Sequence, residues 1–203
     1  MNKEKTWLYT FARGVIWIIN ALIFRSKARG VENFPQEESC IILSNHISAW
    51  DPLTIANFYK VSEIHFMGKE SLFKNRFLRA LFMKLHAFPV SRGASDLGAM
   101  RVAMQVIRDG HVLGIFPEGT RQKDDRMQSI ETGVAVMALK SDVPLVPVHL
   151  SGKYRWWGRV RMVVGKPIEI DDLRAKRADS QTLEALKTRI IDAVNDLRPL
   201  SDF

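Results

Sequence analysis

A histidine and an aspartate stand close together after one short apolar run of this sequence. His46 lies in Asn45-His46-Ile47-Ser48-Ala49-Trp50-Asp51, directly after the run CIILS at residues 40–44. A histidine can take a proton from an alcohol near neutral pH, and it does so better when a carboxylate accepts a hydrogen bond from its other ring nitrogen. A tight turn would bring Asp51 to that nitrogen. The alternative, which the pattern alone favours, is that Asp51 caps a helix starting at Pro52 and that His46 is an ordinary loop histidine.

A second polar cluster follows another apolar run. Phe116-Pro117-Glu118-Gly119-Thr120-Arg121 comes at the end of the run HVLGIF, residues 111–116. Gly119 allows the backbone to approach a ligand closely, and the guanidinium of Arg121 can bind a phosphate through two hydrogen bonds. Glu118 can orient Arg121 or accept a hydrogen bond from a substrate hydroxyl. The alternative is an ordinary turn with a surface ion pair, which contributes about 0–1 kcal/mol.

Together the two clusters resemble the glycerolipid acyltransferase family, and within it the 1-acylglycerol-3-phosphate acyltransferases. Asn-His-x-Ser-x-x-Asp at 45–51 and Phe-Pro-Glu-Gly-Thr-Arg at 116–121 have the family's order and separation. Residues 88–92 (FPVSR) resemble the family's middle motif and residues 143–148 (VPLVPV) its last one, so the resemblance runs from about residue 28 to 168. The chain departs from the family in having Ala87 where glycine is usual, Ser91 where an acid or amide is usual, and Gln122 where serine is frequent.

The resemblance implies an enzyme that transfers an acyl chain to the sn-2 hydroxyl of 1-acylglycerol 3-phosphate, giving phosphatidic acid. His46, oriented by Asp51, would remove the hydroxyl proton as the oxygen attacks a thioester carbonyl. Arg92 and Arg121 would hold the phosphate of the acceptor. Lys69 is a further candidate, as a donor to the oxyanion, against the alternative of a solvated surface lysine. The remaining substrate-binding candidates are Glu118, Gly119 and Thr120.

The thioester would be acyl-CoA or acyl-acyl carrier protein, a co-substrate, so we expect neither a cofactor nor a metal. No serine or cysteine lies in a nucleophile-elbow sequence, which favours direct attack without an acyl-enzyme. The single cysteine, Cys40, excludes an internal disulfide and a Cys-rich metal site, and it indicates a reducing compartment. The other four histidines lack paired ligand spacing: His65, His86, His111 and His149.

Lysine and arginine outnumber the acidic residues by 30 to 22, giving a formal charge of +8. This excess predicts an anionic partner, such as a phospholipid surface, a phosphorylated substrate, an acidic carrier or a nucleic acid. We expect the lysophospholipid, the acyl donor and an anionic membrane surface as partners, and no nucleic acid. The run Tyr154-Arg155-Trp156-Trp157 fits a loop in the membrane interface at least as well as a base-stacking patch.

The N-terminal segment at 7–24 (WLYTFARGVIWIINALIF) is nearly all apolar and has basic residues on both sides. We interpret residues 1–27 as a membrane-associating helical segment lying in the interface, where tryptophans and basic flanks are favoured. A spanning helix, with Arg13 near mid-depth, and a helix buried in the domain are the alternatives. The expected location is the cytoplasmic face of the cell membrane, as a peripheral or monotopic protein.

The elements that must position these residues alternate between strands and helices. Strands are expected at 40–44, 64–68, 88–91, 111–116, 143–150 and 159–164, and helices from Asp51, at 71–86, 96–108, 131–140 and 181–197. This alternation predicts an α/β fold, a single layered domain at 28–203 with a mostly parallel central sheet flanked by helices. In such sheets ligands bind where strands end and helices begin, which is where both polar clusters fall.

Two other functions remain open from the sequence. A sister acyltransferase acting on another lysolipid or on glycerol 3-phosphate would keep His46 and Asp51 and change the contacts around Arg92. A non-catalytic membrane-surface binding protein would keep the apolar N-terminal segment and lose the chemistry.

Overall fold

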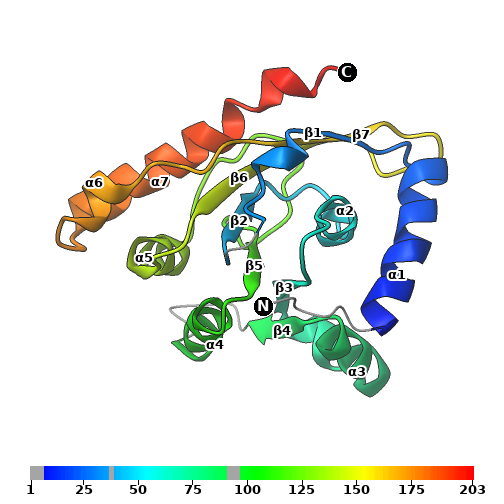
Figure 1. Cartoon of the computed structure of the whole chain (residues 1–203), viewed down its shortest axis with the longest axis horizontal. Helices are drawn as coiled ribbons and strands as arrows, with labels where there is room; N and C mark the ends of the chain where they lie inside the picture. Colours follow the sequence, from blue (N-terminus) through cyan, green and yellow to red (C-terminus); the bar gives the residue numbers. More distant parts are fainter. Residues whose placement is uncertain (1–6, 37–38, 91–96) are drawn as a thin grey trace.

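The computed structural model describes residues 7–36, 39–90 and 97–203, built around a seven-stranded sheet (Figure 1). The strands are β1 (Lys27–Arg29), β2 (Ile41–Ser44), β3 (Ile64–Lys69), β4 (Ala87–Val90), β5 (Val112–Ile115), β6 (Leu145–Gly152) and β7 (Val160–Val164). The α-helices are α1 (Trp7–Ile18), α2 (Asp51–Phe58), α3 (Arg76–Lys84), α4 (Leu97–Arg108), α5 (Thr132–Lys140), α6 (Asp171–Arg174) and α7 (Ser180–Asn195). Short 3₁₀ turns lie at η2 (Val31–Asn33), η3 (Glu70–Phe73) and η4 (Arg198–Ser201), and a π-helical turn, η1 (Ile19–Ile23), follows α1.

The strand order is β1-β7-β6-β2-β5-β3-β4. From β6 to β4 all neighbours are parallel, whereas β7 is antiparallel to β6, and β1 is parallel to β7. The predicted α/β fold with a mostly parallel sheet is confirmed. The short strand β1 and the reversal at β7 were not predicted.

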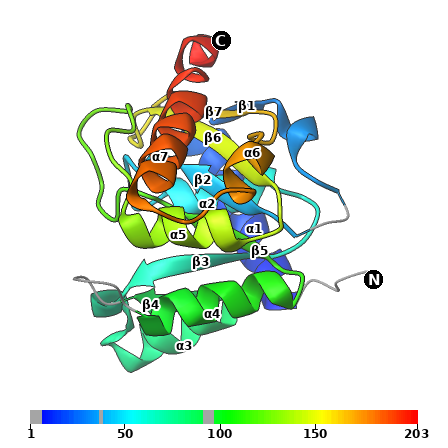
Figure 2. The same ribbon diagram turned by 90° about the vertical axis from the view of Figure 1, so that its left-hand side faces the viewer.

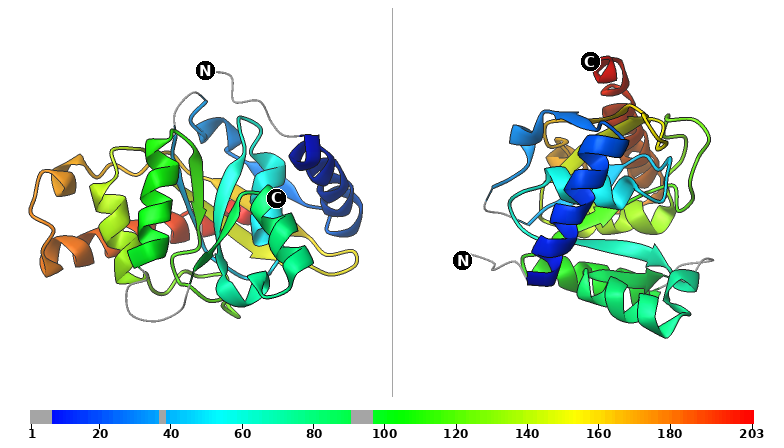
Figure 3. Two further views of the ribbon diagram at one scale, coloured as in Figure 1. Left: turned by 90° about the horizontal axis from the view of Figure 1, so that it is seen from below. Right: turned by 90° about the vertical axis from the view of Figure 1, so that its right-hand side faces the viewer.

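Both faces of the sheet are covered, because successive side chains of a strand point to opposite sides. In β2, Ile41 and Leu43 join a core with α4, α5 and α7, whereas Ile42 packs with Ile55 and Tyr59 on the α2 side. Figure 2 shows α4, α5, α6 and α7 in front of the sheet, and Figure 3 shows α1 crossing the other side. Because helices cover both faces, the side chains on both sides of a central strand are buried, which explains why these strands are continuous apolar runs.

The N-terminal segment packs on the domain along one side only. Tyr9, Asn20 and Phe24 are buried, and α1 lies against α2. The opposite side of the segment is apolar and exposed, with Phe11, Val15, Trp17, Ile18 and Leu22. Among the residues that the structure describes, no helix is long and apolar enough to cross a membrane.

The helix expected at 71–86 is divided into η3 and α3. Asn75 separates them, because its side chain caps α3 by accepting hydrogen bonds from the backbone N–H groups of Phe77 and Leu78 (2.9 and 3.2 Å). No residue of α3 is buried, and Phe77 is 82% exposed. The apolar residues whose spacing predicted this helix are therefore only partly packed on the sheet.

Candidate active site

The two polar clusters meet at one edge of the sheet. β2 ends at Ser44 and its parallel neighbour β5 ends at Ile115, so the loops that follow both strands leave from the same edge. The backbone N–H of Gln122 donates to the carbonyl of His46 at 2.8 Å, which joins the loops directly. His46 therefore lies beside the 116–121 block.

His46 and Asp51 form a hydrogen-bonded pair. Nδ1 of His46 lies 2.7 Å from Oδ2 of Asp51, and the Asp51 side chain is fully buried while His46 is 18% exposed. The backbone N–H groups of Ile47 and Ser48 donate to the same oxygen, each at 2.7 Å. Because Oδ2 is an acceptor, Nδ1 carries the proton, and Nε2 of the imidazole is the nitrogen that can take one.

Asp51 is not the cap of the helix. The N-cap residue of α2 is Trp50, and Asp51 is the first residue of the helix, followed by Pro52. Its side chain turns back into the loop that precedes it. The alternative interpretation of Asp51 as a helix cap is therefore wrong.

Phe116 supports the imidazole ring from one side. The two rings are stacked with their centroids 4.1 Å apart and their planes 24° apart. Together with the contact to Asp51, this stacking fixes the plane of the imidazole. This role of Phe116 was not predicted from the sequence.

Asn45 attaches the loop after β5 to the end of β2. Its side-chain amide donates to the carbonyls of Asp125 (2.7 Å) and Leu150 (2.8 Å), and its Oδ1 accepts from the N–H of Leu150 (2.7 Å). The buried His149 also contacts the carbonyl of Asp125, through Nε2 at 3.0 Å. Asn45 and His149 were missed as site residues, since only the fold brings residues 45, 125 and 149 together.

Glu118 is buried and bonded to backbone, and none of its described contacts is with Arg121. Its Oε1 accepts from the N–H of Gln128 at 3.0 Å. Burial raises the pKa of Glu118, and the backbone N–H groups of Gln128 and His46 and the charge of His46 oppose that rise. Glu118 therefore braces the loop beside the imidazole, whereas the side chains of Thr120 and Arg121 are exposed.

Gly119 is in the left-handed region, with φ +64°, and its N–H donates to the carbonyl of Phe116 at 3.1 Å. A Cβ there would only reach ordinary contact with Glu131, at 3.6 Å. The glycine is therefore required by its backbone conformation and not by crowding among the described residues.

Comparison with known proteins identifies the family. A family model described as acyltransferase matches residues 25–151, which include both polar clusters. The chain belongs to the acyltransferase family. The family resemblance drawn from the two motifs is thus confirmed, and the protein is an acyltransferase enzyme.

Relatives of this acyltransferase are similar over nearly its whole length. A protein of Bacillus subtilis named 1-acyl-sn-glycerol-3-phosphate acyltransferase is 29% identical over 95% of the chain and 100% of the relative. Proteins of the same name from Streptococcus pneumoniae (29% identity; 93% of this chain, 74% of the relative) and Pseudomonas aeruginosa (25%; 94% and 77%) are also similar. The crystal structure of the 1-acyl-sn-glycerophosphate acyltransferase of Thermotoga maritima shares the fold, with a TM-score of 0.71 at 22% identity over 97% of this chain and 79% of that one.

The structure describes one of two further predicted site residues of the acyltransferase. Lys69 is exposed at the carboxyl end of β3, on the same sheet edge as His46, with β5 between β3 and β2. Arg92 lies outside the described residues. Their assigned roles stay predictions.

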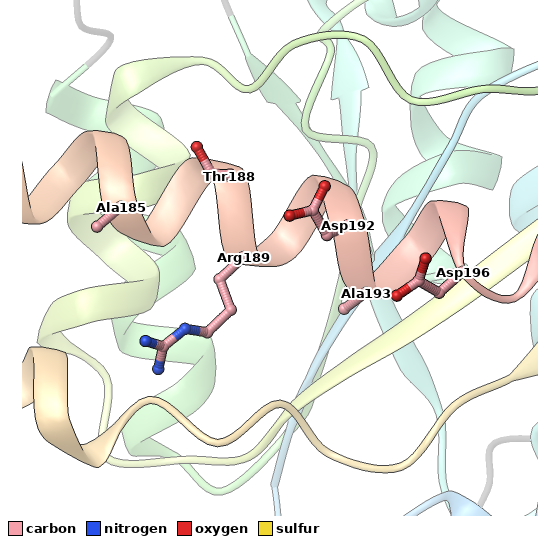
Figure 4. A pocket seen from close by; sticks show the side chains of 6 residues that line it. All are labelled: Ala185, Thr188, Arg189, Asp192, Ala193 and Asp196. Atoms are coloured by element: carbon pink, nitrogen blue, oxygen red, sulfur yellow. The ribbon is translucent and has the colours of Figure 1, made fainter.

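A shallow groove on α7 contains none of the predicted site residues in its lining (Figure 4). It is lined by Ala185, Thr188, Arg189, Asp192, Ala193 and Asp196. Arg189 is occupied there by an ion pair with Asp172, which lowers the pKa of that carboxyl group. Within the described residues, no three histidine, cysteine or acidic side chains are grouped so that they could hold a metal ion.

Proposed function

We propose that this acyltransferase moves a fatty acyl chain from a thioester to the sn-2 hydroxyl of 1-acylglycerol 3-phosphate, giving phosphatidic acid. One observation carries the proposal: the 2.7 Å contact between His46 and the buried Asp51, at the sheet edge where the loop with Arg121 begins. The names of the curated relatives support this acceptor. The donor is acyl-CoA or acyl-acyl carrier protein, and both suit a chain of charge +8 because both carriers are anionic.

In the proposed reaction, Nε2 of His46 takes the hydroxyl proton while the oxygen of the acceptor attacks the thioester carbonyl. Asp51 stabilises the imidazolium that forms. Collapse of the tetrahedral intermediate breaks the carbon–sulfur bond, and the imidazolium returns its proton to the leaving thiolate. General-base catalysis of this kind contributes about 10²–10⁴-fold.

The remaining candidates bind charge. Arg121, exposed beside the dyad, and Arg92 hold the phosphate of the acceptor, for which the planar guanidinium is well suited. Backbone N–H groups of the 118–120 turn and the ammonium of Lys69 are proposed donors to the oxyanion. Every role here belongs to a group of the chain itself, and no step requires a cofactor.

The test is an acyl-transfer assay on the full chain in detergent, with lysophosphatidic acid and each of the two donors. His46→Ala should lower kcat by about 10² or more without lowering the melting temperature. His111→Gln is the matched control, because His111 precedes β5 at the opposite sheet edge; it should keep wild-type kcat. Equal turnover by wild type and His46→Ala would refute the mechanism.

Acceptor competition decides between this function and its alternatives. Preference for glycerol 3-phosphate or for a lysolipid with a larger headgroup would assign the chain to a sister activity. Binding to lipid without any consumption of thioester would make it a non-catalytic membrane-surface protein.

We also propose that the enzyme is a peripheral or monotopic protein of the cytoplasmic face of the cell membrane, with residues 1–27 as its membrane-associating segment. Three exposed apolar features support this location. They are the outer side of α1, the tip of the β6–β7 hairpin with Trp156 and Trp157, and α3 with Phe77, Leu78 and Leu81.

The three features are linked along α1 (Figure 3). At its start, the ring of Tyr9 lies 6.3 Å from that of His86, just after α3. Beyond its other end, in η1, the carbonyl of Ile23 accepts a hydrogen bond from the N–H of Trp157 at 3.0 Å. Basic residues accompany the apolar ones, among them Arg25, Arg76, Arg79 and Arg155, as expected for contact with an anionic leaflet.

A further inference from the structure

The two carboxylate oxygens of Asp51 have different surroundings. Oδ2 interacts with His46 and two backbone N–H groups. Oδ1 is buried and makes no hydrogen bond of ordinary geometry. A buried carboxylate oxygen without a donor costs free energy, so a neighbouring donor is expected.

Tyr154 is the neighbour that can supply this donor. It lies in the loop between β6 and β7, and its hydroxyl donates to Oγ1 of Thr54 at 3.1 Å. Thr54 is fully buried on α2, three residues after Asp51. The pKa of Tyr154 is raised well above 10, first by burial and then by the negative charge of Asp51, so its hydroxyl keeps its proton close to the carboxylate.

The position of this hydroxyl is set by the N-terminal segment. Oγ1 of Thr54 donates to Oδ1 of Asn20 at 3.0 Å, and Ser26 donates to the same oxygen at 2.9 Å. An amide oxygen can only accept, so Thr54 must be the donor to Asn20 and the acceptor from Tyr154. The ring of Phe24 also packs edge-on against Tyr154, at 5.1 Å.

We propose that Tyr154 is a positioning residue for the dyad: its hydroxyl, held by Thr54 and Asn20, shares its proton with Oδ1 of Asp51 and so fixes the plane of the carboxylate that orients His46. The inference rests on the proposed function, because a dyad without chemistry would need no such orientation. It also connects the membrane-facing N-terminal segment to the catalytic base through three consecutive side chains.

Tyr154→Phe tests the proposal, since it removes the hydroxyl and keeps the ring that packs on Phe24. We expect kcat to fall by about tenfold or more, with the KM of both substrates changed less than about twofold. Without its second donor, Asp51 stabilises the imidazolium more strongly, so the acid limb of the kcat profile moves to higher pH. Thr54→Val should change kcat and its pH profile in the same direction. Thr54→Ser keeps the hydroxyl and should therefore keep the wild-type values.

Tyr59→Phe is the matched control. Tyr59 is a second buried tyrosine beside α2, whose hydroxyl pairs with Ser62 at 3.4 Å and whose pKa is raised to about 12, mainly by burial. It should leave kcat and the pH profile unchanged. If Tyr154→Phe and Tyr59→Phe changed the pH profile equally, Tyr154 would have only a packing role and the proposal would be wrong.

A second readout does not depend on turnover. In an NMR titration of histidine-labelled protein, the midpoint of the His46 ring should move to higher pH in Tyr154→Phe and stay in place in Tyr59→Phe. An unmoved midpoint in both variants overturns the inference, even if acyl transfer is found. A moved midpoint in a protein that transfers no acyl chain supports the network and refutes the proposed function.

Discussion

At the scale of single residues, the pair of His46 and Asp51 is held more firmly than a loop histidine needs. Three donors converge on one carboxylate oxygen, and Phe116 stacks on the imidazole at 4.1 Å. In the proposed mechanism, preorganisation of this kind removes the cost of orienting the base during the reaction. A histidine with a purely structural role would not need to be restrained in this way.

Arg121 offers the first prediction. Arg121→Ala should raise the KM for lysophosphatidic acid by about tenfold or more and change kcat less, because the proposed phosphate contact would be made in both the ground state and the transition state. The KM of Arg121→Lys should lie between those of the wild type and Arg121→Ala, since an ammonium group cannot form the two parallel hydrogen bonds of a guanidinium. Steady-state kinetics with varied acceptor measures both.

Arg126→Ala is the control for this series. Arg126 is exposed in the same loop but lies with Asn195, Arg198 and Pro199, on the side toward the end of α7. The KM of Arg126→Ala for lysophosphatidic acid should stay within about twofold of the wild-type value. A similar rise in both alanine variants would mean that the loop contributes only general positive charge.

The residues proposed to react or to bind substrate were easier to predict from the sequence than the residues that hold them in place. His46, Asp51 and the 116–121 block were recognisable because their order and separation together resemble the motifs of the acyltransferase family, whereas the spacing of His46 and Asp51 alone favoured a helix cap. Asn45, Phe116, His149 and Tyr154 act through contacts between distant parts of the chain, such as residue 45 with 125 and 150. No periodicity or spacing reports such contacts before the strand order is known.

At the scale of elements, the loop after β5 depends on groups that also serve the sheet. His149, in β6, is buried and bonded to the carbonyl of Asp125 and to the hydroxyl of Ser201, at 3.0 and 3.2 Å. Burial, the largest cause, lowers the pKa of His149 from its ordinary value of 6.5. The neutral ring is therefore part of the attachment of this loop.

This gives the second prediction, on stability. Because the pKa of His149 is lower in the folded state, the unfolded chain binds its proton first, and stability is lost as the pH falls below about 6.5. The loss is at most about 1.4 kcal/mol per pH unit, the slope of one proton. Denaturant unfolding from pH 8 to 5 should show a shallower decline in His149→Gln than in wild type. Parallel curves would contradict the assignment.

Most elements were predictable because their apolar patterns are strong. The helix α5, expected at 131–140, is found at Thr132–Lys140, and the expected strand 111–116 is found at Val112–Ile115. The division of the 71–86 helix at Asn75 was missed because the cap lies inside an unbroken apolar period. β1 was missed because only three residues form it and its partner, β7, is far along the chain.

At the scale of the whole molecule, most of the exposed large apolar side chains gather along α1 and near both of its ends. The opposite side, with α4, α5 and α7, carries helices whose apolar residues are largely buried in the core. This asymmetry differs from an ordinary scatter of surface hydrophobics and supports the proposed membrane-facing side.

The third prediction follows from it. Replacing Trp156, Trp157 and Phe77 by serine should weaken binding to vesicles of anionic phospholipid by about tenfold or more, measured by sedimentation. Added salt should weaken the wild type as well, by screening the basic residues. Val102→Ser, an equally simple change of an exposed apolar residue on α4, should have no effect. Unchanged binding of the triple variant would place the contact elsewhere.

The reversal of the chain between β6 and β7 has a consequence for engineering. Hairpin tips on a protein surface are usually the safest sites for tags and inserted domains. This tip is different, because a Cβ on Gly158 would lie 2.0 Å from the carbonyl oxygen of Lys153, and Tyr154 follows in the same short turn. An insertion there would disrupt a turn folded tightly on itself, so tags and inserted domains should be kept out of this hairpin tip.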